Sequence, residues 1–207
     1  MNTLTDATNS SLRRPAHVRS KTWHSPCKSN SPESVPHSLE VIPRIRPLFT
    51  AEEDCSVISH RENKIFLKNN REAMEFSFDC VLGQFSSQED VFKKLSYLGE
   101  EVLAGFAATV FAYGQTGSGK TFTMRGKKSS PGLIPLTIKE LFDTIQTHQN
   151  REYLLKVSYL EVYNEMVNDL LDPSKVNLEI RESLEKGIYV DKLTEVEVSC
   201  QQDAYTH

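Results

Sequence analysis

The clearest chemistry in this sequence lies in eight consecutive residues: Gly114, Gln115, Thr116, Gly117, Ser118, Gly119, Lys120 and Thr121. They match Gly-x4-Gly-Lys-Ser/Thr at every fixed position, a pattern typical of loops that bind nucleotide phosphates. Glycines let successive backbone N–H groups turn toward an anion, and a following helix adds its positive N-terminal end. We expect Lys120 to place its charge between the β- and γ-phosphates, and the Thr121 hydroxyl to bind the Mg²⁺ that bridges them.

The segments on either side of this loop fit that chemistry. Residues 109–113 are apolar and rich in β-forming side chains, which predicts a strand buried on both faces in the middle of a sheet. After the loop, apolar residues recur at helical spacing from Ile134 to Ile145. A glycine loop that only makes a tight turn does not explain Lys120 and Thr121 at this offset. The order of strand, loop and helix therefore supports phosphate binding.

Short strands and helices are predicted along the rest of the chain. A helix capped by Ser86 or Ser87 is expected from about residue 87 to 104, and a short helical turn over residues 167–171 is expected to end at Pro173. Strands are expected over residues 39–46, 56–59, 64–67, 74–79, 153–163, 178–181, 187–190 and 194–199. The second to fourth of these predict a small antiparallel patch, and residues 153–163 predict a long central strand.

The composition restricts the class of protein. Of 207 residues, 38% are hydrophobic and 25% are charged, which indicates a largely folded chain with a polar portion. The longest apolar stretch, residues 102–113, falls short of the roughly 20 residues that span a bilayer, so we expect no membrane partner. Four widely spaced cysteines without a Cys-x-x-Cys pair predict free thiols rather than metal ligands.

The charge is unevenly distributed, and this suggests two parts. Residues 1–38 hold five basic and two acidic side chains, so their net charge is +3 and the other 169 residues carry −7. The acidic body argues against a nucleic-acid partner. Eight serines and four prolines without an apolar run predict a disordered arm over residues 1–38, followed by a folded domain over residues 39–207. An organelle transit peptide is the alternative for the arm, disfavoured by Asp6 and by the lack of an amphipathic stripe.

Residues 111–124 resemble the phosphate loop of kinesin motor domains. Four more blocks occur in the order of that family: 44–47, 78–92, 132–135 and 158–171. The five blocks extend the resemblance over residues 39–207, and residues 151–157 look most like the centromere-associated subgroup. The resemblance implies an α/β fold of the P-loop NTPase type, with a mixed, mainly parallel central sheet flanked by helices.

The same resemblance implies an ATP-dependent microtubule motor that binds ATP or ADP with Mg²⁺. In that family pattern Arg44, Arg46 and Pro47 line the adenine, and the Phe122 ring lies on its other side; a base between these groups is sound stacking chemistry. Without the resemblance, Arg44 and Arg46 are better explained as the solvent-facing side of an edge strand. Phe122 alone is then a core residue of a helix.

The sequence also departs from the family. Neither an Asn-x-x-Ser-Ser-Arg-Ser-His stretch nor an Asp-Leu-Ala-Gly-Ser-Glu stretch occurs in it. These are the two switch motifs, which complete the Mg²⁺ shell and position the attacking water. We therefore interpret the sequence as the N-terminal part of a motor, truncated before the switch regions, with weak binding and negligible hydrolysis on its own. Pro43 inside the first expected strand, and Ala107 and Ala108, are milder departures.

The resemblance implies tubulin as the partner and the cytoplasm and microtubule cytoskeleton as the location, including the spindle or kinetochore. By position, Lys156, Arg181 and Lys186 are candidates for microtubule contacts, although solvated surface charges explain them equally well. Dimerisation, where it occurs, is expected through a stalk outside these residues.

Three other interpretations stay open. In the first, the chain is a non-catalytic nucleotide- or tubulin-binding module. In the second, it is another P-loop ATPase or nucleotide kinase, but this interpretation leaves four of the five blocks unexplained. In the third, the fragment does not fold stably, because a sheet cut in mid-order exposes an unpaired edge and an apolar face.

Overall fold

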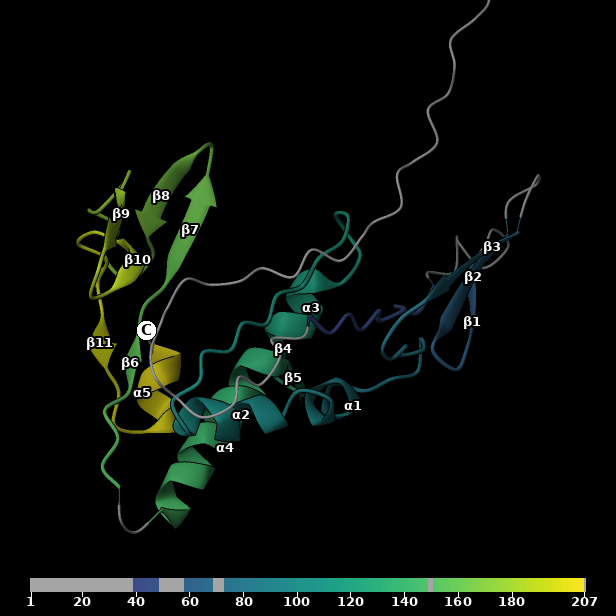
Figure 1. Cartoon of the computed structure of the whole chain (residues 1–207), viewed down its shortest axis with the longest axis horizontal. Coiled ribbons are helices and arrows are strands. Elements are labelled where there is room, and N and C mark those ends of the chain that lie inside the picture. The colour runs from purple at the N-terminus through teal and green to yellow at the C-terminus, as the bar shows by residue number, and fades with distance from the viewer. Residues whose placement is uncertain (1–38, 49–57, 69–72, 149–150, 207) are drawn as a thin grey trace, which may run out of the picture. The chain divides into compact units, whose positions relative to one another are not determined.

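The structure is a computed structural model that describes residues 39–48, 58–68, 73–148 and 151–206 (Figure 1). All of its helices and strands belong to one unit, Ile42–His207. The expected disordered arm, residues 1–38, lies outside the described residues, and so do residues 56 and 57 of one expected strand. The boundary between arm and domain therefore stays a prediction.

The predicted antiparallel patch is confirmed for the residues that the structure describes. Strands β1 (Ile58–Arg61), β2 (Lys64–Lys68) and β3 (Ala73–Ser77) form a sheet in the order β1-β2-β3 (Figure 1). Apolar and polar residues alternate along β3, although its Met74 and Phe76 side chains are 42% and 43% exposed. Lys64 forms an ion pair with Glu75 across β2 and β3.

The helix expected over residues 87–104 is two helices, α1 (Gln88–Lys93) and α2 (Tyr97–Leu103). Ser87 caps α1 as predicted, since its hydroxyl accepts from the Asp90 N–H at 3.1 Å and the Asp90 carboxylate accepts from the Ser87 N–H at 2.9 Å. The break is a tighter turn, in which the Leu95 N–H donates to the Phe92 carbonyl at 2.8 Å. Apolar spacings of three and four residues fit both kinds of turn, so periodicity did not locate the break.

Helix α4 (Leu133–Thr147) is the element against which the other helices of this part of the chain pack. It confirms the helix predicted after the loop. Helices α1, α2 and α5 (Gln201–Thr206) contact it (Figure 1). Leu82, Val91 and Leu133 form the buried core, and Met124 of helix α3 (Lys120–Met124) packs against them. A short hairpin, β4 (Gly126–Lys127) and β5 (Ser130–Pro131), separates α3 from α4. The helix that follows the phosphate loop is thus anchored in the core.

The pairing of the central strands differs from the expectation. Residues 109–113 form no strand, and the Phe111 and Tyr113 side chains are 68% and 95% exposed. The strand expected over residues 39–46 reduces to a bridge of Arg44 with Leu82, which is the one parallel pairing within the described residues. An apolar segment predicts that it will be covered, yet its sequence does not supply the neighbours that hydrogen-bond to it.

The strands of the C-terminal third form two-stranded antiparallel pairs. The expected long strand over residues 153–163 is divided into β6 (Lys156–Val157) and β7 (Leu160–Tyr163), and the expected helical turn over residues 167–171 is wrong, because β8 (Met166–Asp169) is a strand. Asn164 and Glu165 both have positive φ, 48° and 62°, and join β7 to β8 in a two-residue turn. This turn chemistry outweighed the helical spacing. The remaining strands are β9 (Ile180–Ser183), β10 (Gly187–Val190) and β11 (Val196–Glu197), of which β9 pairs with β10 and β11 with β6.

A buried carboxylate organises this third of the chain. Asp169 at the end of β8 is 2% exposed and accepts hydrogen bonds from the backbone N–H groups of Thr194 at 2.7 Å, Leu171 at 2.8 Å and Asp172 at 3.1 Å. Burial by itself raises the pKa of this carboxyl, but the bonds from Thr194, Leu171 and Asp172 outweigh it and lower the pKa to about 2.

We predict that Asp169→Asn lowers the free energy of unfolding at neutral pH by about 2 kcal/mol, because a buried charged acceptor is lost. The native pKa lies below the ordinary value of 3.8, so the contribution of the carboxylate is present above about pH 4 and is lost as the pH falls toward 2. Urea unfolding at several pH values measures both effects. Asp143→Asn, at an exposed α4 pair with Lys139, is the control. An equally steep acid loss in wild type and Asp169→Asn would contradict the assignment.

Candidate functional site

The glycine loop has the backbone that its sequence predicts. Gly117 and Gly119 adopt φ of 79° and 98°, a left-handed conformation that glycine accepts at low cost. Helix α3 begins at Lys120, directly after Gly119, and the Thr123 N–H donates to the Gly119 carbonyl at 2.9 Å. Loop and helix are therefore continuous, as a phosphate-binding loop requires.

The Lys120 side chain binds back to the first two residues of this loop. Its ammonium donates to the carbonyls of Gly114 at 2.9 Å and Gln115 at 2.8 Å. These bonds engage two of the three donors of the ammonium and hold the positive charge at the mouth of the loop. The positive charge therefore lies beside the first two residues of the loop.

Thr121 follows in the first turn of α3, and its side chain is exposed. A hydroxyl is a hard oxygen donor of the kind that Mg²⁺ accepts, and Mg²⁺ commonly takes one or two protein ligands and completes its shell with phosphate and water. Across the described ranges no cluster of three or more His, Cys, Asp or Glu residues forms a metal site. Thr121 thus fits a metal that arrives together with phosphate.

Arg44 and Phe122 are brought together, although 78 positions separate them in sequence. The Arg44 guanidinium carbon lies 5.3 Å from the centroid of the Phe122 ring. Its Nη1 donates to Gln88 Oε1 at 2.6 Å and Thr123 Oγ1 at 2.9 Å, and Nη2 donates to the Ser86 carbonyl at 3.2 Å. Burial lowers the pKa of Arg44 from its ordinary value of 12.5. We call Arg44 and Phe122 the base wall.

The other two residues expected at the adenine lie close to Arg44 in the chain. Arg46 Nη1 donates to the Pro47 carbonyl at 3.0 Å, and Pro47 is exposed. The structure places Arg44 over the Phe122 ring. The Arg46 and Pro47 assignments stay predictions.

Sequence reasoning missed several residues of this site. Gln88, Ser86 and Thr123 bind Arg44, and Lys127 of β4 places its Nζ 5.9 Å from the Phe122 centroid. Gln88 directly follows the Ser87 cap, so its position in α1 was predictable, but its partner 44 residues earlier was not. Lys127 lies on β4, which begins directly after Arg125, the residue that caps α3.

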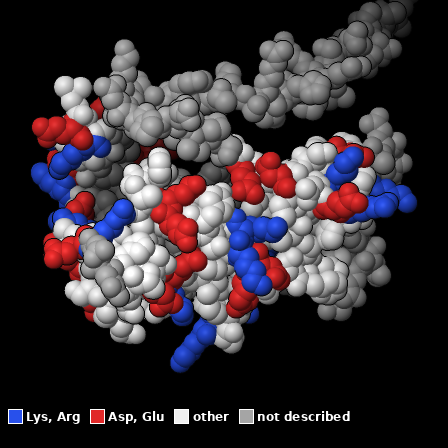
Figure 2. Space-filling view, turned by 60° about the horizontal axis from the view of Figure 1, so that its bottom comes forward, with Lys and Arg blue, Asp and Glu red and all other residues white. Residues whose placement is uncertain are grey.

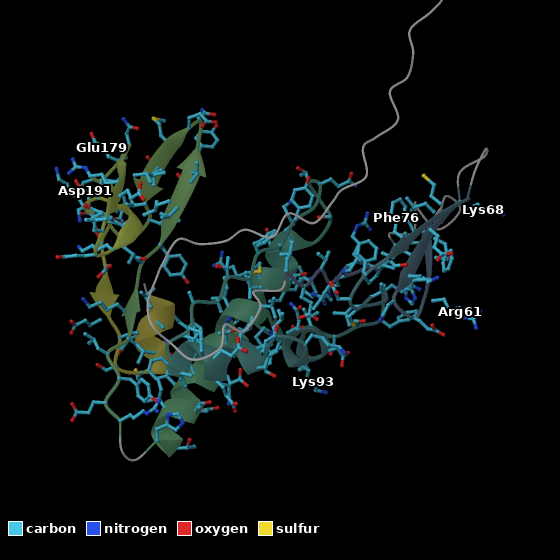
Figure 3. All side chains as sticks on the ribbon, viewed as in Figure 1. Arg61, Lys68, Phe76, Lys93, Glu179 and Asp191 are labelled. Atoms are coloured by element: carbon cyan, nitrogen blue, oxygen red, sulfur yellow. The ribbon has the colours of Figure 1, made fainter. Side chains whose placement is uncertain are left out.

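The three candidate microtubule residues all have partners within the chain. Lys156 lies 3.5 Å from Glu195, and Arg181 lies 2.9 Å from Glu179 and 3.1 Å from Asp191; Figure 3 labels both acids. Lys186 Nζ lies 5.3 Å from the Tyr189 ring. On the face that Figure 2 shows, acidic and basic side chains are intermixed over the described residues. Arg181 and Lys186 belong to one hairpin, β9 and β10, whereas Lys156 is on β6.

In the part of the chain that the structure describes, no helix has the length and apolar character needed to cross a membrane.

Residues 33–207 match the family model described as the kinesin motor domain. The chain is 43% identical over 165 residues to kinesin-like protein KIN-7I of Oryza sativa subsp. japonica, and 42% identical over 165 residues to KIN-7O of Arabidopsis thaliana. Each match covers 79% of this chain, but only 14% and 13% of those proteins. The resemblance to the centromere-associated subgroup stays a prediction.

A solved structure agrees with the family match. The chain is similar to a structure titled as a fast kinesin, with a TM-score of 0.77 and 32% identity. The match covers 82% of this chain and 51% of the kinesin chain, so this chain spans about half of that motor. The predicted kinesin-type α/β fold is confirmed at this level.

We predict that Gly126→Ala disrupts the hairpin between α3 and α4. Gly126 has φ of 73°, and a Cβ there overlaps the Gly132 nitrogen and the Ser130 carbonyl. We expect a loss of about 3 kcal/mol in the free energy of unfolding, measured by chemical denaturation. Gly105→Ala is the matched control, because φ is 101° there but no described atom lies within 4 Å of the added Cβ. Equal losses in both variants would mean that close packing at Gly126 contributes nothing.

Proposed function

Because the chain belongs to the kinesin motor-domain family, we propose that it is the ATP-binding part of a microtubule-based motor. One observation carries the proposal: α3 joins Lys120, at the mouth of the glycine loop, to Phe122, at the base wall, within three residues. A nucleotide has the same two ends, a polyphosphate and a flat base. The loop residues 114–121 bind the phosphates, and Arg44, Arg46, Pro47 and Phe122 line the adenine.

The residues of the loop divide the work of binding. Backbone N–H groups of the glycine loop donate to the phosphate oxygens, and Lys120 exchanges carbonyl partners for phosphate oxygens when ATP or ADP enters. The Thr121 hydroxyl would hold the Mg²⁺, which would supply positive charge to neutralise the phosphates. Stacking on Phe122 orients the base.

Hydrolysis by the complete motor is the activity that this family membership supports. The two switch motifs do not occur within these 207 residues, so we propose that this stretch binds nucleotide without turning it over. The alternative, a non-catalytic nucleotide- or tubulin-binding module, predicts the same binding. A microtubule-stimulated phosphate release measured on these residues would contradict both.

We expect the chain to bind a fluorescent ADP analogue in the presence of Mg²⁺, and Lys120→Ala to weaken this binding by about 30-fold or more. Binding weakens because the variant loses charge-assisted bonds to phosphate. Fluorescence titration measures the change in affinity. Lys139→Ala, at an exposed position of α4, is the control for removing a lysine. Circular dichroism checks that each variant is folded. Equal binding by Lys120→Ala and wild type would rule out the loop as the phosphate site.

We propose that the partner is tubulin and that the β9–β10 hairpin offers Lys186 to its acidic surface. Arg181 on the same hairpin is already paired with Glu179 and Asp191, so its charge is largely compensated. This interpretation places the protein on the microtubule cytoskeleton of the cytoplasm, with the spindle or kinetochore as the finer location.

We predict that Lys186→Ala weakens microtubule co-sedimentation about threefold at low salt. Arg181→Ala changes co-sedimentation less, because the Arg181 charge is already paired with Glu179 and Asp191 and is less available to tubulin. The difference shrinks as salt rises, since exposed charges are screened. Lys93→Ala on α1, labelled in Figure 3, is the control. Unchanged binding by Lys186→Ala would remove Lys186 from the interface.

A further inference from the structure

Gln88 is the most deeply buried polar side chain near the base wall, with only 1% of its surface exposed. Its Oε1 accepts from Arg44 Nη1 at 2.6 Å, and its Nε2 donates to the Phe122 carbonyl at 2.6 Å. One amide thus touches both residues of the base wall. Buried amides are costly unless both ends are bonded, and here both are.

The direction of this amide is fixed by its partners. A guanidinium only donates and a carbonyl only accepts, so the oxygen must face Arg44 and the nitrogen must face Phe122. The Phe122 carbonyl belongs to the last turn of α3, where carbonyls lack helical partners. Gln88 supplies the missing donor. It therefore fixes the backbone of Phe122 as well as the guanidinium of Arg44.

The position of Gln88 is itself set by a local device. It is the first residue of α1, and the reciprocal bonds between Ser87 and Asp90 fix where that helix begins. Val91, one turn further, is 5% exposed and packs with Leu82 and Leu133 in the core. The amide is thus held by a capped helix that is anchored in the core through Val91, and not by a loop.

We infer that Gln88 is a positioning residue that sets the separation of the Arg44 guanidinium and the Phe122 ring, and so controls binding of the adenine base but not of the phosphates. The inference rests on the proposed function, because it assigns a role within the same nucleotide site. Gln88 acts through its two partners. Neither side-chain hydrogen bond of Gln88 involves Lys120, which is held instead by the carbonyls of Gly114 and Gln115.

The test compares a ligand that has a base with one that does not. Calorimetric titration of the full chain with ADP and with inorganic pyrophosphate, each with Mg²⁺, reports the two ends of the site separately. Gln88→Met removes both bonds at similar volume, and we expect ADP affinity to fall about tenfold while pyrophosphate affinity stays within about twofold. Gln146→Met, at an exposed position of α4, is the matched control.

A second variant keeps the test decisive if Gln88→Met does not fold. Gln88→Glu retains the acceptor for Arg44 but places an oxygen against the Phe122 carbonyl, so we expect a smaller, about threefold, loss for ADP alone. Either variant binding ADP as wild type does, or losing ADP and pyrophosphate equally, overturns the inference. Wild type that binds neither ligand contradicts the proposed function itself, so the two failures are distinct.

Discussion

A half-buried guanidinium needs acceptors, and much of the site depends on where Arg44 finds them. They come from Ser86 and Gln88 at the start of α1 and from Thr123 of α3, two segments that are far apart in sequence. Because Arg44 keeps its charge, each of these acceptors must stay in place or leave a cation without compensation. The same group lies over the Phe122 ring, so the electrostatic constraint and the shape of the base wall are one arrangement.

Asp169 plays the corresponding role in the C-terminal third. Its carboxylate accepts from the turn after β8 and from Thr194, 25 residues later, and so connects segments that belong to different two-stranded pairs. Two opposite charges, one in each region, therefore organise chain segments that are far apart in sequence. Polar groups with several fixed partners specify such connections more strictly than apolar contacts.

The sequence was most informative where function depends on consecutive residues. The loop at residues 114–121, the Ser87 cap and the β1–β3 patch are encoded locally, and the structure agrees with each. Spacing failed at residues 167–171, where two positive φ angles at Asn164 and Glu165 decided for a hairpin. Residues 109–113 are apolar, but their pairing depends on distant segments. The contact of Gln88 with Arg44 could not be predicted for the same reason, since the two residues are 44 positions apart.

Lys120, Thr121 and Phe122 are neighbours on one short helix, so the helix sets the distances between their side chains. Each residue of a helix advances about 1.5 Å and turns about 100°, so these side chains leave α3 in different directions at fixed offsets. The distance between the Lys120 ammonium, which binds charge, and the Phe122 ring, which stacks on a flat surface, is therefore limited by the helix. A ligand with a longer or shorter link between its charged and aromatic ends cannot contact Lys120 and Phe122 at the same time, whatever the strength of its individual contacts.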